Sequence, residues 1–387
     1  MTSDSKTLDV VNAVEERYSE AAEQREESLC CPVDYDAKYL KVIPQEVIDR
    51  DYGCGDPSKY LFAGETVLDL GSGGGKICFI ASQVVGAEGK VIGVDMNDSM
   101  LDLARRSESQ VAERIGYANV EFKRGKIQDL AIDRDEVQEY LDKHPVSSET
   151  DLRAFESYLD EMRSNRPMIQ DDSIDVVVSN CVLNLVESRE KEQLFRELHR
   201  VLKPGGRAVI SDIVSDETVP IAMQNDAELW SGCISGAFQE QEFLRAFEKA
   251  GFSGLEVAVY QEQPWQVVQG IEFRSVTVIA HKAENGSCND YHEAVIYRGP
   301  FAEVIDDDGH VYRRGQRSKV CRSTFQKIGQ RPYQDDFILV PPHQAVQDGE
   351  AKPMECIGEE RKPSETKGKD FNLTVLGDSC CEPGECC

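Results

Sequence analysis

A strand-like apolar run that ends in an acid and then breaks into glycines constrains this chain more than any other feature. The run is VLDLGSGGGK, residues 67–76, and a second apolar run, residues 91–96, brings another acid, Asp95, near its end. A strand, a tight glycine turn, a helix and a second strand with a terminal carboxylate form the layout of a nucleoside-cofactor site. The sequence therefore predicts an enzyme that binds such a cofactor at the carboxyl end of a parallel sheet.

Strand-like and helix-like segments alternate after this run, which predicts right-handed crossovers and a parallel sheet covered on both faces. The expected strands are 66–71, 90–95, 119–125, 173–180 and 206–214, and the expected helices are 75–85, 98–114, 190–202 and 239–250. Two last strand-like segments, 255–261 and 273–281, have no helix between them, which favours an antiparallel pair at the sheet edge. We therefore predict an α/β, Rossmann-like fold with a seven-stranded sheet.

Around this sheet the chain divides into further parts. Residues 1–64 form an N-terminal arm, with a helix expected over 8–22, and a cysteine-bearing loop. Residues 65–282 form the cofactor domain. Within it, residues 131–172 carry a net charge of −7 and are expected to form two surface helices of a solvated insertion.

The C-terminal third changes in character. A small α+β or β module is expected over 283–342, with strand-like pieces at 294–297 and 337–340 and a turn signal at Asp308-Gly309. Residues 343–387 are polar, which predicts a disordered tail. That tail ends in the cysteines Cys380, Cys381, Cys386 and Cys387.

The overall charge excludes several kinds of partner. The formal net charge is −28, with 71 acids against 43 bases. Such a surface repels phosphate backbones and anionic lipids, so we expect neither a nucleic-acid nor a membrane partner. The polar N-terminus lacks the basic start and apolar core of a signal peptide, and no apolar run approaches the ~20 residues that span a bilayer. A cytoplasmic protein is expected.

Two details of the cofactor motif favour S-adenosylmethionine over NAD. Asp69 precedes the glycines Gly71 and Gly73, where its carboxylate can meet the ammonium of an amino-acid cofactor but would repel a pyrophosphate. The last two strands also form a pair rather than a second mononucleotide-binding half. Asp95, followed by Met96, is placed to accept hydrogen bonds from ribose hydroxyls.

A third strand end completes the expected cofactor pocket. Residues 125–129 follow the strand 119–125, and Ile127 is expected to lie against the adenine ring. An ordinary strand-end turn is the alternative for this segment. For the pocket as a whole, NAD or a sheet that binds nothing remain alternatives.

The cysteines raise the question of the acceptor. Cys181, preceded by Asn180, ends the fourth strand, and Cys233 lies before the helix at 239–250, where such folds bind acceptors. Cys54 lies between two glycines and is expected to be an exposed loop thiol. Thiols beside a sulfonium suit a soft centre. The usual zinc-ligand spacing is missing nearby, whereas trivalent arsenic binds thiolates and keeps a lone pair that can attack a methyl group.

The chain resembles the arsenite methyltransferases, a class I methyltransferase family, over most of its length. The segments that carry the resemblance include Tyr18, YGCG at 52–55, LDLGSG at 68–73, GVDM at 93–96, SNCVLNLV at 179–186, SDI at 211–213 and LWSGCISGA at 229–237. Two departures are Asp51, where many members have a second tyrosine, and the acidic insertion at 131–172.

This resemblance implies a chemistry for each thiol. Cys181 and Cys233 would hold As(III), and Cys54 would be a third ligand or form a transient disulfide. One of Cys30 and Cys31 would be a fourth catalytic thiol, and we assign Cys31. Asp69, Asp95, Ile127 and Asn180 would position S-adenosylmethionine so that its methyl faces the arsenic. Arsenite or its thiol conjugates would be the substrate, and glutathione or thioredoxin the reductant.

Two other functions stay open on the sequence. A methyltransferase of the same fold could act on selenium, tellurium or a thiol metabolite. A non-catalytic, thiol-rich protein could instead buffer metalloids. The intact glycine turn with Asp69 and Asp95 argues against the buffer, because storage requires no methyl donor.

Overall fold

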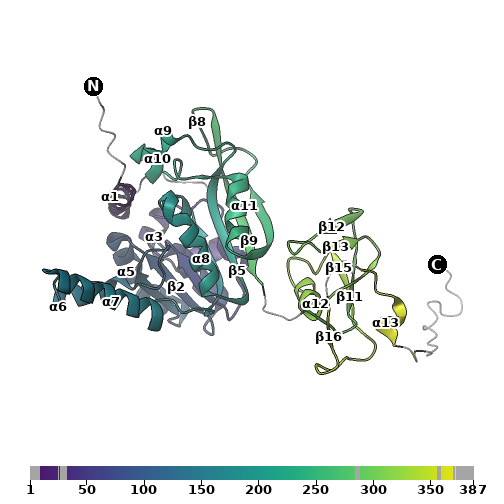
Figure 1. Cartoon of the computed structure of the whole chain (residues 1–387). Coiled ribbons are helices and arrows are strands. Elements are labelled where there is room, and N and C mark those ends of the chain that lie inside the picture. Colours follow the sequence, from purple (N-terminus) through teal and green to yellow (C-terminus); the bar gives the residue numbers. More distant parts are fainter. Residues whose placement is uncertain are drawn as a thin grey trace. The chain divides into compact units, whose positions relative to one another are not determined.

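The computed structural model describes residues 9–24, 26, 33–283, 288–354, 359–368 and 371. The chain separates into two compact units, Met1–Ala283 and Glu284–Cys387. Both are drawn in Figure 1, and each is described here by itself.

The first unit is built on one large mixed sheet whose seven main strands run in the order β3-β2-β1-β4-β5-β9-β7. Strands β1 to β5 are parallel, and β9 pairs antiparallel with both β5 and β7. The bounds are β1 Thr66–Leu70, β2 Lys90–Asp95, β3 Val120–Arg124, β4 Ile174–Asn180, β5 Leu202–Ser215, β7 Phe252–Tyr260 and β9 Ile271–Lys282. Two short strands, β6 (Phe238–Gln239) and β8 (Gln266–Val268), pair with β5 and β9. The predicted seven-stranded Rossmann-like fold is confirmed.

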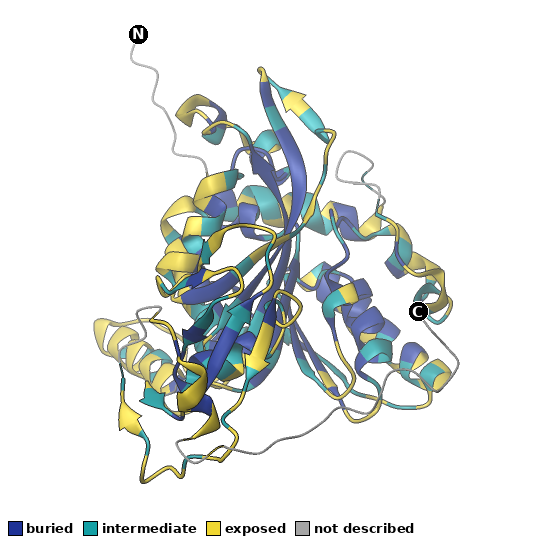
Figure 2. Cartoon of the chain, turned by 90° about the vertical axis from the view of Figure 1, so that its right-hand side faces the viewer, coloured by how far each residue is buried: buried dark blue, intermediate teal, exposed yellow. Residues whose placement is uncertain are grey.

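Helices cover both faces of this sheet, as the alternating pattern predicts. Strand side chains alternate between the two faces: Leu68 and Leu70 pack with the helices α8 and α11, while Val67 packs with α4 and α5. The central strands are buried along most of their length (Figure 2). The helix bounds are α4 Lys76–Val85, α5 Asp98–Ile115, α8 Lys191–Val201 and α11 Glu240–Lys249.

Two segments around the sheet add to the predicted pattern: one strand begins earlier than predicted, and the acidic insertion forms a core of its own. Strand β5 begins at Leu202 rather than 206, because Leu202 already pairs with Ile174 before an irregularity in the register. The acidic insertion forms two helices, α6 (Arg134–Lys143) and α7 (Glu149–Asn165). They enclose a small core of their own, centred on Ile132, Val137 and Met162.

An N-terminal helix, α1 (Val10–Glu23), lies close to the short helix α10 (Ala227–Ser231), as Figure 1 shows. The Arg17 guanidinium donates to the Glu228 carbonyl at 2.9 Å and to Ser231 Oγ at 3.0 Å. On the other side, the Asn97 amide donates to the Glu15 carbonyl and to Ser19 Oγ. The helix is therefore tied both to α10 and to the segment after β2.

The second unit contains a three-stranded sheet of order β14-β11-β15 and a β12–β13 hairpin. The bounds are β11 Ala294–Tyr297, β12 Glu303–Ile305, β13 Val311–Arg313, β14 Arg317–Lys319 and β15 Phe337–Val340, with the helix α12 at Arg322–Ile328. The hairpin turn is centred on Asp307 and Asp308, one residue before the predicted Asp308-Gly309.

The predicted disorder from residue 343 onward is wrong for part of that segment. Strand β16 (Lys352–Pro353) pairs with β10 (Asn289–Asp290), and a helix, α13, spans Pro363–Lys367. Arg361 is only 2% exposed and makes two hydrogen bonds to the Asp290 carboxylate. A composition-based prediction misses this because polar contacts, and not apolar residues, hold the segment. The four terminal cysteines lie outside the described residues.

Within the described part of the chain, no helix is both long and apolar enough to cross a bilayer.

Candidate active site

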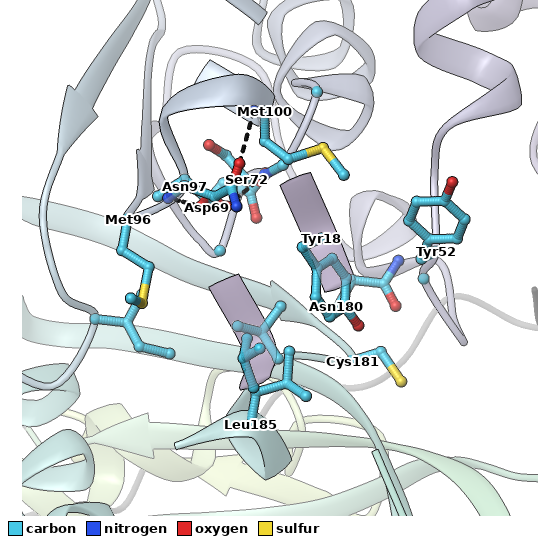
Figure 3. A pocket seen from close by; sticks show the side chains of 18 of the residues that line it. Tyr18, Tyr52, Asp69, Ser72, Met96, Asn97, Met100, Asn180, Cys181 and Leu185 are labelled. Atoms are coloured by element: carbon cyan, nitrogen blue, oxygen red, sulfur yellow. Dashed lines mark hydrogen bonds between the residues drawn. The ribbon is translucent and has the colours of Figure 1, made fainter. Parts of the chain in front are cut away.

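A cavity opens at the carboxyl ends of β1, β2 and β4, and α1 lies along it. Its lining includes every residue that the sequence predicts for the cofactor: Asp69, Gly71, Gly73, Asp95, Met96, Ile127 and Asn180. Figure 3 labels Asp69, Met96 and Asn180 of this set, together with Cys181, Tyr18 and Tyr52. The sequence missed Val11, Val14 and Glu15 of α1, whose helical pattern carries no signal for a ligand.

The start of the glycine turn is shaped by its neighbours. Gly71 has a φ of +69°, and a side chain there would collide with Val182, so only glycine fits. Beside it, Asp69 is 2% exposed and accepts a hydrogen bond from the Cys78 thiol at 3.2 Å. Burial raises the pKa of Asp69 to about 7. A cationic ligand in the cavity would favour the ionised carboxylate.

The second acid is held firmly by the backbone. One carboxylate oxygen of Asp95 accepts from the Gly73 N–H and the other from the Asn97 N–H, both at 2.8 Å. Burial raises the pKa of Asp95 as well. Nearby, the Ser72 hydroxyl is buried and has no hydrogen-bond partner among the residues that the structure describes. Two carboxylates and an unsatisfied hydroxyl fit a ligand that combines an ammonium with ribose hydroxyls.

Three thiols from distant parts of the chain cluster beside this cavity, and one of them, Cys181, lines it. Cys54, Cys181 and Cys233 are each at most 6% exposed, and they share one core cluster. The Cys233 thiol donates to the Cys181 carbonyl at 3.3 Å. Hydrogen bonds with the Cys233 and Cys54 thiols, which favour the protonated Cys181 thiol, raise the pKa of Cys181 well above its usual value, and burial adds to this effect. Cys181 therefore rests as a neutral thiol.

The expectation that Cys54 is an exposed loop thiol is wrong. Its exposed fraction is 6%, and burial raises its pKa. The flanking glycines serve a different purpose: a side chain at Gly53 would collide with Asn180, and one at Gly55 would collide with Ser211. They let the loop pack closely against the sheet.

Tyr18 of α1 joins the cavity to the thiols. It lines the cavity, and its ring meets that of Tyr52 edge-on at 6.2 Å between centroids. Burial, reinforced by contact with the Cys233 and Cys181 thiols, raises the pKa of Tyr18 well above its usual value. Tyr18 was matched to the family in the sequence, but no role was predicted for it.

Two buried charges behind the thiols were not predicted. Lys191 donates to the Gly236 carbonyl, three residues after Cys233, and lies over the Phe238 ring at 4.1 Å. Burial lowers the pKa of Lys191 to about 8. Asp212 accepts from the Leu183 N–H, and burial raises its pKa to about 6. Both residues brace the segments that carry the thiols.

The fourth predicted thiol cannot be placed. Cys31 and its neighbour Cys30 lie outside the described residues.

Comparison with known proteins adds to this geometry. Residues 61–166 and 156–251 match a family model described as a methyltransferase domain, and residues 284–371 match one described as a domain of unknown function. An arsenite methyltransferase from Aquipseudomonas alcaligenes is 31% identical over 331 residues, which are 81% of this chain and 85% of that protein. A human arsenite methyltransferase is 27% identical over a match that covers 78% of this chain and 74% of the human protein.

A solved structure shows the same likeness. The crystal structure of an arsenic(III) S-adenosylmethionine methyltransferase from Chlamydomonas reinhardtii is 26% identical to this chain, with a TM-score of 0.55. The match covers 82% of this chain and 99% of that one.

Proposed function

The chain belongs to the arsenite methyltransferase family, and on that premise we propose that it transfers methyl groups from S-adenosylmethionine to trivalent arsenic held by Cys54, Cys181 and Cys233. The observation that carries the proposal is the cluster of these three buried thiols around Cys181, which itself lines the cofactor cavity. When bound, S-adenosylmethionine supplies a methyl group on a cationic sulfur, which the arsenic lone pair can attack.

The resting protonation of the thiols suits the capture of arsenite. As each thiol binds, a sulfur–arsenic bond forms, and the thiol proton leaves with an arsenic-bound hydroxyl as water. Neutral thiols such as Cys181 are therefore competent without a separate base. Burial beneath α1 keeps bulk water away from the bound arsenic, and fixed thiols hold it in one orientation.

On the cofactor side, Asp69 is assigned to the ammonium and Asp95 to the ribose. Gly71, Gly73 and Met96 would line the methionine and ribose part of the ligand, and Ile127 the adenine. Asn180 is assigned to the junction between cofactor and thiols, because its side chain lines the cavity directly before Cys181.

Methyl transfer leaves arsenic formally oxidised, so a two-electron reductant is needed between cycles. We propose a thiol reductant, either glutathione or thioredoxin, with Cys31 as an N-terminal redox thiol. A cytoplasmic site of action is consistent with a centre that needs reduced cysteines.

The proposal predicts the outcome of a direct assay. The full-length protein, incubated with S-adenosylmethionine, arsenite and glutathione, should yield methylated arsenic in a chromatographic speciation experiment. Cys181→Ser and Cys233→Ser should each lower the rate at least a hundredfold, because serine oxygen is a poor ligand for this soft centre.

Cys321→Ser is the matched control, since Cys321 is an equally buried thiol in the second unit. Full activity of Cys181→Ser or Cys233→Ser would refute the thiol assignment. Methylation of selenite or tellurite in place of arsenite would refute the choice of acceptor.

A further inference from the structure

We propose that Asn180 is a positioning residue that fixes the Cys54 loop beside Cys181, so that one strand end sets two of the three arsenic ligands. This inference rests on the proposed role of Cys54 as a ligand. It also assigns to Asn180 a role beyond contact with the cofactor.

The Asn180 amide is committed to the Cys54 loop through both of its polar atoms. Its oxygen accepts from the Cys54 N–H at 2.8 Å and from the Gly55 N–H at 3.0 Å. Its nitrogen donates to the Gly55 carbonyl at 2.7 Å. One side chain therefore holds two successive residues of a loop that is 125 residues away in sequence.

The loop is shaped to receive this amide. A side chain at Gly53 would occupy the space of the Asn180 amide, and one at Gly55 would collide with Ser211. Glycine on both sides of Cys54 thus allows the backbone to come within hydrogen-bond distance of Asn180 on one flank and to pack closely against Ser211 of β5 on the other.

Two further side chains hold the same loop. Ser275 of β9 donates to the Cys54 carbonyl at 2.7 Å. Tyr35 donates to the Gly55 carbonyl at 3.1 Å, and the Asn180 nitrogen donates to the Tyr35 hydroxyl at 3.2 Å. Both backbone polar groups of Cys54 are thereby bonded to side chains, and its thiol is left to meet Cys181.

The same contacts reach the glycine turn of the cofactor site. Lys76, which follows that turn, lies over the Tyr35 ring at 3.6 Å and pairs with Asp51 at 2.7 Å. Asp51 is three residues before Cys54. The Cys54 loop is therefore anchored to the strand end on one side and to the cofactor turn on the other.

The chemistry requires an amide at position 180. A carboxylate could accept from the two N–H groups but could not donate to the Gly55 carbonyl, and alanine could do neither. Asn180→Asp should thus loosen the loop partly, and Asn180→Ala should loosen it more.

The test counts sulfur ligands on arsenic, without S-adenosylmethionine. Full-length wild-type protein, loaded with one equivalent of arsenite under glutathione-free conditions, should show three arsenic–sulfur bonds by X-ray absorption spectroscopy. Cys54→Ser and Asn180→Ala should each show two bonds and an oxygen ligand. The double variant should match Cys54→Ser, because Asn180 acts through Cys54.

Ile127→Ala is the matched control, since Ile127 lines the cofactor part of the cavity. It should weaken S-adenosylmethionine binding by calorimetry while keeping three arsenic–sulfur bonds. Peptide mapping after iodoacetamide gives a second readout: Cys54 should be alkylated at least fivefold faster in Asn180→Ala. If Asn180→Ala does not fold, Asn180→Asp and Ser275→Ala replace it, with the same expected direction.

The outcomes separate this inference from the proposed function. Three bonds and unchanged Cys54 alkylation in a folded Asn180 variant would overturn the positioning role alone. If the wild type instead shows only two arsenic–sulfur bonds, and Cys54→Ser does not change that number, Cys54 is not a ligand and the inference is overturned with that assignment.

Discussion

Two of the three thiols have a backbone conformation that non-glycine residues avoid. Cys181 has a φ of +64° and Cys233 a φ of +63°. The left-handed region costs an ordinary residue roughly 1–2 kcal/mol relative to glycine. Such strain persists where the surrounding structure enforces it, and it concentrates at functional sites. Here it turns two thiols from separate segments toward the same point.

This strain predicts an unusual order of stability. The free energy of unfolding of Cys233→Gly should exceed that of Cys233→Ala by about 1 kcal/mol, because glycine accepts the left-handed backbone. At Cys78, inside α4, the order should be reversed by about 1 kcal/mol, since glycine weakens a helix interior. Urea unfolding of the four variants measures both differences. An alanine preference at both positions would show that the Cys233 backbone is not strained.

The raised pKa of Asp69 predicts a pH dependence of cofactor binding. Its ionised fraction rises as the pH passes through about 7, and only the ionised form attracts the cofactor's ammonium. Between pH 5.5 and 7 the affinity should rise by roughly tenfold, a range in which an α-amino group with a pKa of ~7.7–8.0 stays charged.

Calorimetric titration with S-adenosylmethionine at several pH values measures this slope. Asp69→Asn should bind weakly at every pH and lose most of the slope. A slope that persists in Asp69→Asn would assign the titration to another group, and Asp212 is the first to examine, because its pKa is about 6.

At the scale of single elements, α1 is the least expected part of the site. It borders the cofactor cavity through Val11, Val14 and Tyr18 and is tied to α10 through Arg17. Because α10 ends two residues before Cys233, the same helix borders the cofactor cavity and contacts the segment that leads to a candidate acceptor thiol. We therefore expect it to act as a cover over both.

Loosening this helix should expose the thiols. Arg17→Met keeps the apolar stem but removes the hydrogen bonds to Glu228 and Ser231, so α1 should open more often. We expect severalfold faster alkylation of Cys181 and Cys233, read by peptide mass spectrometry. The exposed neighbour Glu16, changed to Gln, provides the control. Equal alkylation rates in both variants would mean that α1 does not protect the thiols.

The sequence predicts elements better than it predicts contacts between them. The predicted strand ends 71, 95 and 180 lie within one residue of those of β1, β2 and β4, because burial and turn chemistry act over a few residues. The burial of Cys54 could not be predicted in this way. It depends on Asn180, Ser275 and Tyr35, which lie up to 221 residues away and show no periodic pattern.

At the scale of the whole molecule, the described thiols and cofactor residues of the site all come from the first unit. The second unit has its own core, which includes Val295, Tyr297, Tyr312 and Phe337. Its deepest ion pair, Arg361 with Asp290 at 2.6 Å, joins its last folded segment to its first. Sequence composition placed a disordered tail there, because a single buried arginine hardly changes the average polarity of a segment.

This division predicts that damage to the second unit leaves the first intact. Arg361→Met should destabilise the second unit by up to about 3 kcal/mol, because it leaves the Asp290 carboxylate without its buried partner. Both tryptophans, Trp230 and Trp265, lie in the first unit. The tryptophan fluorescence midpoint and the affinity for S-adenosylmethionine should therefore stay unchanged while calorimetry detects an earlier transition.

Arg313→Met is the control, since Arg313 pairs with Glu303 at the surface and should contribute under about 1 kcal/mol. A fluorescence midpoint that falls together with the calorimetric one in Arg361→Met would mean that the two units unfold as one.

The three thiols have a consequence for competition with small thiols. They lie on a loop before β1, at the end of β4 and after α10, and under the proposed function the fold would hold them as one tridentate chelator. Once the first sulfur has bound arsenic, the next two bonds form within the same molecule, at an effective concentration set by the fold and not by the solution. A free thiol would have to replace all three bonds to recover the metalloid. We therefore expect the site, if its three thiols bind arsenic as proposed, to take arsenic from small-thiol conjugates.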